Sequence, residues 1–241
     1  MEQNHYNTLF RYEEHHWWYR ARRLLVHEII RKYFKGKTKL SIADIGCGTG
    51  ALTKELEQYG KCIGVDISEQ AINFCRSRGI TNLRVGSAEE TGCAPNSLDV
   101  VVCLDVLEHL EDDGTGIREI KRILKPGGMA IIFVPAFMFL WSITDEVSHH
   151  HRRYRLPEIA AKLTSENFIL VRQTYFNTLL FPFIAIVRLT VQLLHIHPKS
   201  EMETGHGFIN MILYRIFYLE RYILRYTNFP FGVSIMMIVK K

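Results

Sequence analysis

The stretch that decides the fold is Leu40-Ser41-Ile42-Ala43-Asp44-Ile45-Gly46-Cys47-Gly48-Thr49-Gly50. Its apolar first half predicts a buried strand, its glycines predict a tight turn, and the spacing of residues 51–59 predicts a helix. Residues 62–65 are apolar again and lead directly to Asp66. Together these features are typical of a strand–helix–strand unit with a ligand loop after its first strand. Glycine allows such a loop to take positive φ and to approach a ligand closely.

Acidic residues begin and end this unit. Asp66 ends the second strand, where an acid commonly binds the hydroxyls of a ribose. Gly46, Gly48 and Ala51 also fit the dinucleotide pattern G-x-G-x-x-G/A, so an NAD-binding module is an alternative. Asp44 at the start of the loop suits a cationic ligand better than a pyrophosphate, which favours S-adenosylmethionine.

Further apolar runs alternate with helical patterns along the chain. Strands are predicted at 83–85, 98–104, 129–134, 168–176 and 233–239, and helices at 69–78 and 116–124. This alternation predicts an α/β fold with a doubly wound, mostly parallel sheet of seven strands. Ligands of such sheets bind beyond the carboxyl ends of the strands, where the loop at 44–50, Asp66 and the Leu104-Asp105 pair should meet.

Several motifs occur in a familiar order and at ordinary spacing: Asp44-x-Gly46-x-Gly48-x-Gly50, Asp66, Ala88-Glu89, Leu98-Asp99-Val100-Val101-Val102 and Leu124-Lys125-Pro126-Gly127-Gly128. As a set they resemble the class I S-adenosylmethionine-dependent methyltransferases of the type 11/23 kind, over residues 38–175 and the final strand. The resemblance implies a Rossmann-like methyltransferase fold with S-adenosyl-L-methionine as cofactor. The cofactor-binding residues that it implies are Asp44, Gly46, Gly48, Asp66, Ile67, Ala88, Glu89 and Leu104.

Composition narrows the classes of protein to which this chain could belong. The 241 residues carry a formal net charge of only +5, so the charge balance does not indicate a nucleic-acid-binding protein. Five cysteines occur singly with no C-x-x-C pair, which predicts reduced thiols in the cytoplasm rather than a disulfide framework or a zinc site built on cysteines. The first residues include no apolar run, so we expect no secretory signal.

Three segments are predicted: an N-terminal helical lid at 1–37, a core at 38–175 plus 231–241, and a helical insertion at 176–230. In the lid, Trp18 and Arg22 belong to the dense run Trp17-Trp18-Tyr19-Arg20-Ala21-Arg22-Arg23. We expect both to face the substrate. The alternative is an amphipathic helix that packs Trp17 or Trp18 on the core and leaves its charges in water.

The insertion is strongly apolar. Residues 176–196 are almost continuously apolar, and residues 208–226 place arginines and tyrosines opposite an aliphatic face, with Glu220 as the exception. That pattern is typical of a helix lying in a membrane interface. We therefore expect the insertion to dock on the inner face of the cytoplasmic membrane, with helix packing or a homodimer interface as the alternative. A transmembrane hairpin is disfavoured because its charged residues would be costly in hydrocarbon.

The first group with catalytic potential is Asp105-Val106-Leu107-Glu108-His109, which directly follows the fourth strand. On a helical turn, Asp105, Glu108 and His109 would share one face and hold Mg²⁺ or Mn²⁺, or Glu108 would orient His109 as a general base. The segment resembles the acid-x-x-Glu-His segment of the ubiquinone-biosynthesis O-methyltransferases, in which it is linked to a divalent metal. The alternative is that it only caps the following helix.

The second group is Asp145 with the run His149-His150-His151-Arg152-Arg153-Tyr154. Three consecutive histidines cannot all point one way, so the run alone is not assigned as a metal site. We expect His150 to be a second candidate base, and Asp145, Arg152, Arg153 and Tyr154 to bind an anionic head group, since arginine pairs well with phosphate and carboxylate. The alternative is a solvated basic loop that touches phospholipid or pairs with Asp145 and Glu146.

The lid, this loop and the apolar insertion together resemble a membrane-associated bacterial methyltransferase subgroup found with lipid-linked sugar biosynthesis. The sequence thus predicts O-methylation of a membrane-associated amphiphile with an anionic or polar head, of the polyprenyl-phosphate or glycolipid type first and a quinone precursor second. The alternatives are a soluble small-molecule methyltransferase that dimerises through the insertion, and a non-catalytic cofactor-binding module.

Overall fold

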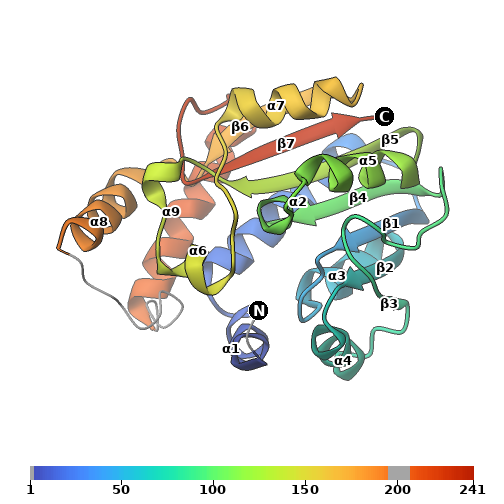
Figure 1. Cartoon of the computed structure of the whole chain (residues 1–241), viewed down its shortest axis with the longest axis horizontal. Helices are drawn as coiled ribbons and strands as arrows, with labels where there is room; N and C mark the ends of the chain where they lie inside the picture. The colour runs from blue at the N-terminus through green and yellow to red at the C-terminus, as the bar shows by residue number, and fades with distance from the viewer. Residues whose placement is uncertain (1–2, 195–206) are drawn as a thin grey trace.

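The predicted sheet is present in the structure, a computed structural model that describes residues 3–194 and 207–241 (Figure 1). The seven strands lie in the order β3-β2-β1-β4-β5-β7-β6, and β7 is antiparallel to both of its neighbours. The strands are β1 Leu40–Ile45, β2 Gly60–Asp66, β3 Leu83–Val85, β4 Leu98–Leu104, β5 Leu124–Pro135, β6 Ile169–Phe176 and β7 Ser234–Lys240. This topology confirms the predicted doubly wound, mostly parallel sheet.

Helices cover both faces of the sheet, which explains why its central strands are apolar throughout. One face packs against α5 (Asp113–Ile123) and α7 (Leu156–Ser165). The other packs against α2 (Trp17–Tyr33), α3 (Ala51–Leu56) and α9 (Phe208–Leu224). Alternate residues of β4 separate accordingly, with Val101 on the first face and Val100 and Val102 on the second.

Some predicted boundaries are corrected. The helix predicted at 51–59 ends at Leu56 and continues as the 3₁₀ turn η1 (Glu57–Tyr59). The helix predicted at 116–124 is α5, which begins earlier because the side chain of Asp112 accepts a hydrogen bond from Gly114 N and caps it. The N-terminal segment forms α1 (Gln3–Tyr12) and α2, and α4 (Glu69–Ser77) follows β2.

Between β6 and β7 the chain forms α8 (Phe181–Leu193) and α9, and residues 195–206 of the predicted insertion lie outside the described residues. Glu220, the exception on the predicted aliphatic face, is buried and accepts hydrogen bonds from the backbone N–H groups of residues 177, 178 and 179. Its carboxylate therefore ties α9 to the start of α8.

Part of the polar face of α9 forms ion pairs with another helix of the protein. Arg221 and Arg225 both pair with Glu28 of α2, so these two arginines do not form the free interfacial face that the helical pattern predicted. Within the described residues, no helix combines the length and the apolar composition needed to cross a bilayer.

Candidate functional site

A cavity of about 1410 Å³ lies beyond the carboxyl ends of β1, β2 and β4, at the edge of the sheet predicted from the sequence. One half is lined by α1 and the loop between β1 and α3. The other half is lined by α2, the loop at 141–151 and α8. The residues predicted to hold the cofactor all line this cavity, namely Asp44, Gly46, Gly48, Asp66, Ile67, Ala88, Glu89 and Leu104.

The glycine loop forms a close-fitting cradle. Gly46 has φ +69° and Gly48 has φ +55°, a conformation that favours glycine. The Gly46 N–H donates to Val65 O at 2.8 Å, and a Cβ at position 46 would collide with Cγ2 of Val106. A side chain here would have to displace Val106, which itself lines the cavity.

Two buried carboxyl groups stand beside this cradle. Asp44 accepts a hydrogen bond from Thr53 Oγ1 at 2.6 Å, and burial raises the pKa of Asp44 to about 7. Asp66 accepts from the backbone N–H groups of Gly48 and Ser68, at 2.8 and 2.9 Å, and burial also raises the pKa of Asp66. Neither carboxyl makes an ion pair within the described residues, so this half of the cavity suits the cationic ammonium and sulfonium groups of S-adenosylmethionine.

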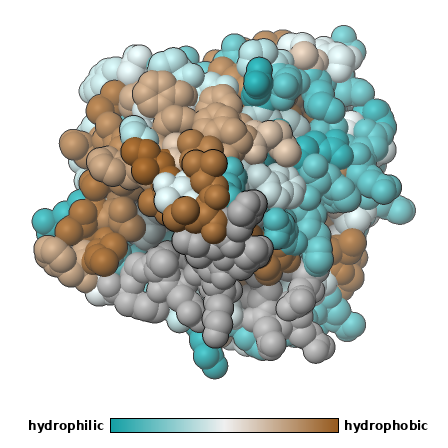
Figure 2. Space-filling model, turned by 60° about the vertical axis from the view of Figure 1, so that its left-hand side comes forward, coloured by the Kyte–Doolittle hydropathy of each residue, from teal (hydrophilic) through white to brown (hydrophobic). Residues whose placement is uncertain are grey.

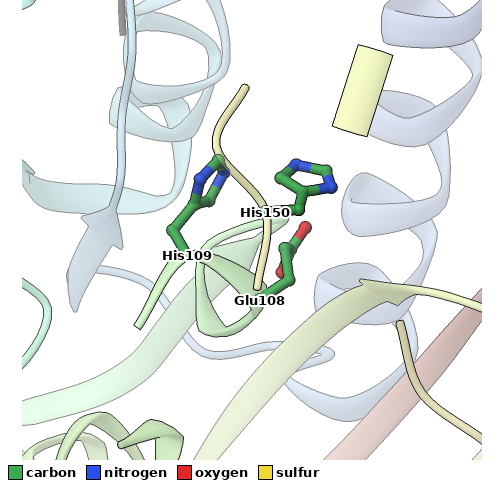
Figure 3. A group of neighbouring side chains, drawn as sticks. All are labelled: Glu108, His109 and His150. Carbon is green, nitrogen blue, oxygen red and sulfur yellow. The ribbon is translucent and has the colours of Figure 1, made fainter. Parts of the chain in front are cut away.

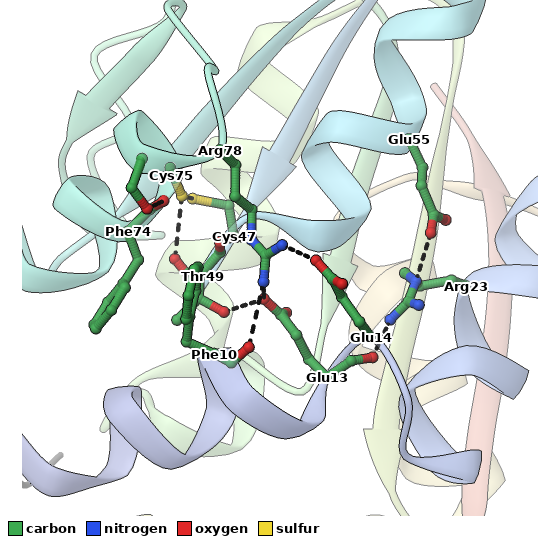
Figure 4. A network of polar contacts seen from close by, with 12 residues as sticks. Phe10, Glu13, Glu14, Arg23, Cys47, Thr49, Glu55, Phe74, Cys75 and Arg78 are labelled. Atoms are coloured by element: carbon green, nitrogen blue, oxygen red, sulfur yellow. Dashed lines mark hydrogen bonds and ion pairs between the residues drawn. The ribbon is translucent and has the colours of Figure 1, made fainter.

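Helix α1 closes the cavity over the glycine loop (Figure 4). Glu13, at the end of α1, pairs with Arg78 at 2.8 Å and accepts from Thr49 Oγ1, while Arg78 Nε donates to Thr49 O at 2.8 Å. Glu14 also pairs with Arg78. Burial raises the pKa of Glu13. The network ties the end of α1 to Thr49 of the glycine loop. Helix α1 must therefore move if a ligand is to enter or leave the cavity on the side that α1 covers.

Three side chains with catalytic potential meet in the second half of the cavity (Figure 3). Glu108 and His109 belong to the 3₁₀ turn η2 (Leu107–His109), and His150 comes from the loop after α6 (Ile143–Val147). One ligand atom from each lies within 4.8 Å of the other two. Burial raises the pKa of Glu108 well above its ordinary value, whereas burial and His150 lower the pKa of His109 to about 4.

Asp105 does not join this group, contrary to the prediction of a shared helical face. The chain turns at Asp105, which has φ +52°, and the carboxylate pairs with Arg22 of α2. Arg22 and Trp18 both line the cavity, as predicted for substrate contact, and the guanidinium carbon of Arg22 lies 5.2 Å from the centroid of the Trp18 ring.

Asp145 organises the loop that carries His150. It is fully buried, accepts a hydrogen bond from His150 Nδ1 at 2.7 Å, and forms a two-point pair with Arg153, each contact at 2.8 Å. Burial alone would raise the pKa of Asp145, but the bonds from His150 and Arg153 outweigh it and hold the pKa below its ordinary value. The ionised carboxylate can only accept, so the Nδ1–H of His150 donates to it and leaves Nε2 free.

The predicted anion clamp is therefore corrected. The guanidinium of Arg153 already pairs with Asp145, and Arg152 lies outside the cavity lining, where it contacts Glu111 O at 2.6 Å and Asp113 at 3.5 Å. Tyr154 is also not a cavity residue, because it is buried and its hydroxyl donates to Asp113 Oδ2 at 2.8 Å. Asp145 positions protein groups rather than a substrate.

Sequence reasoning missed the residues that α1 and α8 bring to the cavity, among them Tyr6, Glu13, Phe183 and Val187. No local motif marks Tyr6 or Glu13, since their position depends on α1 folding back across the glycine loop. The apolar composition of α8 was visible, but not which of its residues would line the cavity.

Comparisons with known proteins agree with this geometry. Residues 43–132 match a family model described as a methyltransferase domain. The ubiquinone biosynthesis O-methyltransferase of Methylococcus capsulatus is 33% identical over 128 residues, covering 47% of this chain and 54% of the relative. The chain thus spans about half the length of the curated relatives that it matches.

Solved structures extend the likeness of the fold to most of the chain. A SAM-dependent methyltransferase from Archaeoglobus fulgidus superposes with a TM-score of 0.57 at 23% identity, covering 91% of this chain and 94% of the other. The Haemonchus contortus phosphoethanolamine N-methyltransferase 2, solved with S-adenosyl-L-methionine, gives 0.58 at 20% identity, covering 89% and 51%. This chain accordingly contains a methyltransferase domain and has the class I S-adenosylmethionine-dependent methyltransferase fold.

Proposed function

We propose that this protein transfers a methyl group from S-adenosylmethionine to an oxygen atom of a membrane-associated amphiphile with a polar head group. The observation that carries the proposal is the continuity of the cavity. The same space is lined by the glycine loop at one end and, at the other, by the apolar side chains of α8, such as Phe183 and Val187. A polar head could thus meet the donor while an apolar tail lies along α8.

The donor half has the groups that S-adenosylmethionine requires. Asp44 and Asp66 would bind its cationic and ribose portions, and Gly46 and Gly48 allow the backbone to approach it. Ala88 and Glu89 would lie against the adenine. When bound, the cofactor would supply an electrophilic methyl group on a sulfur that leaves readily, so the main tasks of the protein are alignment and proton removal.

Proton removal is the role we assign to the histidines of the second half. His150 is held through Nδ1 by Asp145, which leaves Nε2 to accept the proton of an acceptor hydroxyl. The pKa of His109, about 4, keeps this neighbouring imidazole neutral at physiological pH, so it can accept a hydrogen bond but is a weak base. Both side chains line the cavity.

The charges of the cavity favour a neutral polar head over an anionic one. Arg188 of α8 lines the cavity and donates to a backbone carbonyl at 2.8 Å. Arg22 and Arg153 line it too, and each is already paired with a carboxylate of the protein. A phosphate would have to compete with Asp105 and Asp145 for these guanidinium groups. A glycolipid or quinone-precursor hydroxyl therefore fits better than a bare phosphate.

Exposed apolar side chains support a peripheral membrane location on the inner face of the cytoplasmic membrane. Figure 2 shows hydrophobic side chains gathered on the face of the molecule that carries α8. Phe183, Ile186 and Leu193 of α8 are 69, 64 and 78% exposed, and Phe208 of α9 is 70% exposed. Exposed apolar patches of this kind indicate a membrane or protein contact.

The reaction can be tested with the purified protein, S-adenosylmethionine carrying a labelled methyl group, and the total lipid extract of the organism that carries this protein. We expect mass spectrometry to find a lipid that has gained one labelled CH₂ unit, with no gain for the Asp66→Ala variant. A product confined to water-soluble compounds would overturn the amphiphile proposal. Absence of both labelled product and S-adenosylhomocysteine binding would overturn the enzyme itself.

Vesicle flotation tests the membrane contact separately. Partial burial of Phe183 and Ile186 in lipid would contribute about 1 kcal/mol each, so replacing both with serine should weaken vesicle binding about tenfold or more. Ile169→Ser is the matched control, because Ile169 is 62% exposed at the start of the edge strand β6, at the opposite end of that strand from α8. Equal flotation of both variants, or loss of a dimer instead of vesicle binding, would contradict membrane docking.

A further inference from the structure

The cluster of Glu108, His109 and His150 joins segments that lie far apart in the sequence. Figure 3 shows the carboxyl of Glu108 and the two imidazole rings gathered between η2 and the loop after α6. Among the histidine, cysteine and acidic side chains of the described residues, these three have ligand atoms close enough to share one metal ion. One atom from each lies within 4.8 Å of the other two. Bonds of about 2.1 Å in a tetrahedral site would require ligand atoms about 3.4 Å apart, which small side-chain rotations could achieve.

Glu108 gives a second, independent indication. The residue is 0% exposed, and neither of its carboxyl oxygens has a hydrogen-bond partner within the described part of the chain. Buried carboxyl groups are nearly always hydrogen-bonded or paired, because leaving them unsatisfied is costly. A cation between Glu108 and the histidines would satisfy both oxygens.

The surroundings of His150 resemble the second shell of a metal site. Histidine ligands commonly donate their other ring N–H to a carboxylate, which fixes the ring and its tautomer. His150 makes such a bond to Asp145, and Arg153 in turn fixes Asp145. The nitrogen left free on His150 is Nε2, the atom that would coordinate.

The donor set differs from the one expected from the sequence. Asp105 pairs with Arg22 and is not part of the cluster, so the oxygen-rich set of Asp105, Glu108 and His109 is not assembled. His150 takes the third position. Two imidazoles and one carboxylate suit borderline transition metals such as Zn²⁺, whereas Mg²⁺ prefers oxygen ligands.

We propose that Glu108, His109 and His150 bind one divalent transition-metal ion, with Zn²⁺ preferred over Mg²⁺, and leave a coordination position open to the cavity. With the metal bound, His109 and His150 would act as ligands in place of the base role proposed above. The metal would polarise the acceptor hydroxyl and make it more acidic, and the proton would pass to water. Only this role rests on the proposed function, since metal binding by the three residues does not depend on it. Asp145 is the positioning residue of the site.

The test is metal content after equilibrium dialysis against Zn²⁺ or Mg²⁺, measured by elemental mass spectrometry, with Co²⁺ absorption as a spectroscopic check. We expect one equivalent of Zn²⁺ in the wild-type protein and none of Mg²⁺. His150→Ala and Glu108→Gln should each weaken Zn²⁺ binding at least tenfold, and Asp145→Asn should weaken it 10–100-fold. His151→Ala, which alters the exposed neighbouring histidine, and Asp105→Asn should both retain one equivalent.

The folding of each variant is checked by circular dichroism and by binding of S-adenosylhomocysteine, so that loss of metal is not confused with loss of structure. A folded His150→Ala variant that keeps full Zn²⁺ affinity, or a wild-type protein that binds no Zn²⁺, would overturn the site. Methyl transfer that is unchanged in metal-free protein would overturn the role of the metal and leave the proposed function intact. Stoichiometric Zn²⁺ without any methyl transfer would support the site and count against the proposed function.

Discussion

Replacing Asp44 with asparagine should remove a pH dependence of ligand binding that the wild-type protein shows. Asp44 is 3% exposed, and burial raises its pKa to about 7, although the hydrogen bond from Thr53 acts in the opposite direction. Asp66 and Glu13 face the same region and raise the pKa further through their negative charge. In the ligand-free protein below pH 7, Asp44 is therefore mostly protonated.

S-adenosylhomocysteine carries an α-ammonium group, and a cation in this half of the cavity favours the ionised form of Asp44. Binding below pH 7 must then release a proton. Proton linkage predicts that affinity falls about tenfold for each pH unit below 7, or about 100-fold from pH 7 to pH 5, and is flat above pH 7. The same shift affects the stability of the ligand-free fold. A carboxyl whose pKa rises from about 3.9 to about 7 on folding makes the fold less stable as the pH rises from about 4 to about 7, and a bound cation offsets this loss.

Isothermal titration calorimetry at several pH values, in buffers of different ionisation enthalpy, measures both the affinity and the number of protons released. We expect about one proton below pH 6.5 for the wild-type protein and none for Asp44→Asn, which keeps the size of the side chain. Glu13→Gln is the control, because burial also raises the pKa of Glu13, and this variant should keep most of the slope. A wild-type affinity that does not change with pH, or a slope that survives in Asp44→Asn, would refute the reasoning.

Two further substitutions test the cradle and the lid. Gly46→Ala should destabilise the fold by about 2–4 kcal/mol, because residue 46 has a positive φ and its Cβ would collide with Val106. In denaturant unfolding, adding Val106→Ala to this variant should recover part of the lost stability. Strictly additive effects of the two substitutions would contradict the collision. Arg78→Gln should release the end of α1 by breaking its pair with Glu13 and speed the dissociation of S-adenosylhomocysteine several-fold in stopped-flow measurements. The exposed Arg76→Gln should leave that rate unchanged, and equal rates in all three proteins would exclude α1 as a lid.

The sheet and the donor half of the cavity could be predicted because both follow from local patterns. Strands buried on both faces must be apolar throughout, and Val100, Val101 and Val102 make such a run. Once the strands are parallel, the residues that follow them must converge on one edge of the sheet. Asp44 and Asp66 therefore line one cavity although 21 residues separate them in the chain.

The acceptor half could be predicted only in part, because its arrangement depends on partners distant in the sequence. Asp105 shares the predicted segment with Glu108 and His109, but Arg22 of α2 captures its carboxylate. Spacing within a segment cannot reveal such a competitor supplied by another segment. Arg153, by contrast, pairs with Asp145 of its own loop, which the sequence allowed as the alternative to an anion-binding role.

Helical patterns have the same limit. On a helical wheel Glu220 interrupts an aliphatic face, which argues against burial of that face. In the structure its carboxylate accepts three backbone N–H groups of residues 177–179, in the turn that leads from β6 into α8. A wheel describes one helix alone, so it cannot show that a buried acid meets the turn before another helix.

The two halves of the cavity differ in how far their charged side chains are paired with opposite charges, and this difference indicates which kind of ligand suits each half. Asp44 and Asp66 make no ion pair within the described residues, so the donor half lacks a positive charge that S-adenosylmethionine would bring. In the acceptor half, Arg22 and Arg153 already have carboxylate partners and Arg188 donates to a backbone carbonyl, so an anionic acceptor would gain little there. A cationic donor and a neutral acceptor are the combination that these charges favour. Under the proposed function, the apolar wall formed by α8 would give such an acceptor a path from a lipid surface to the donor.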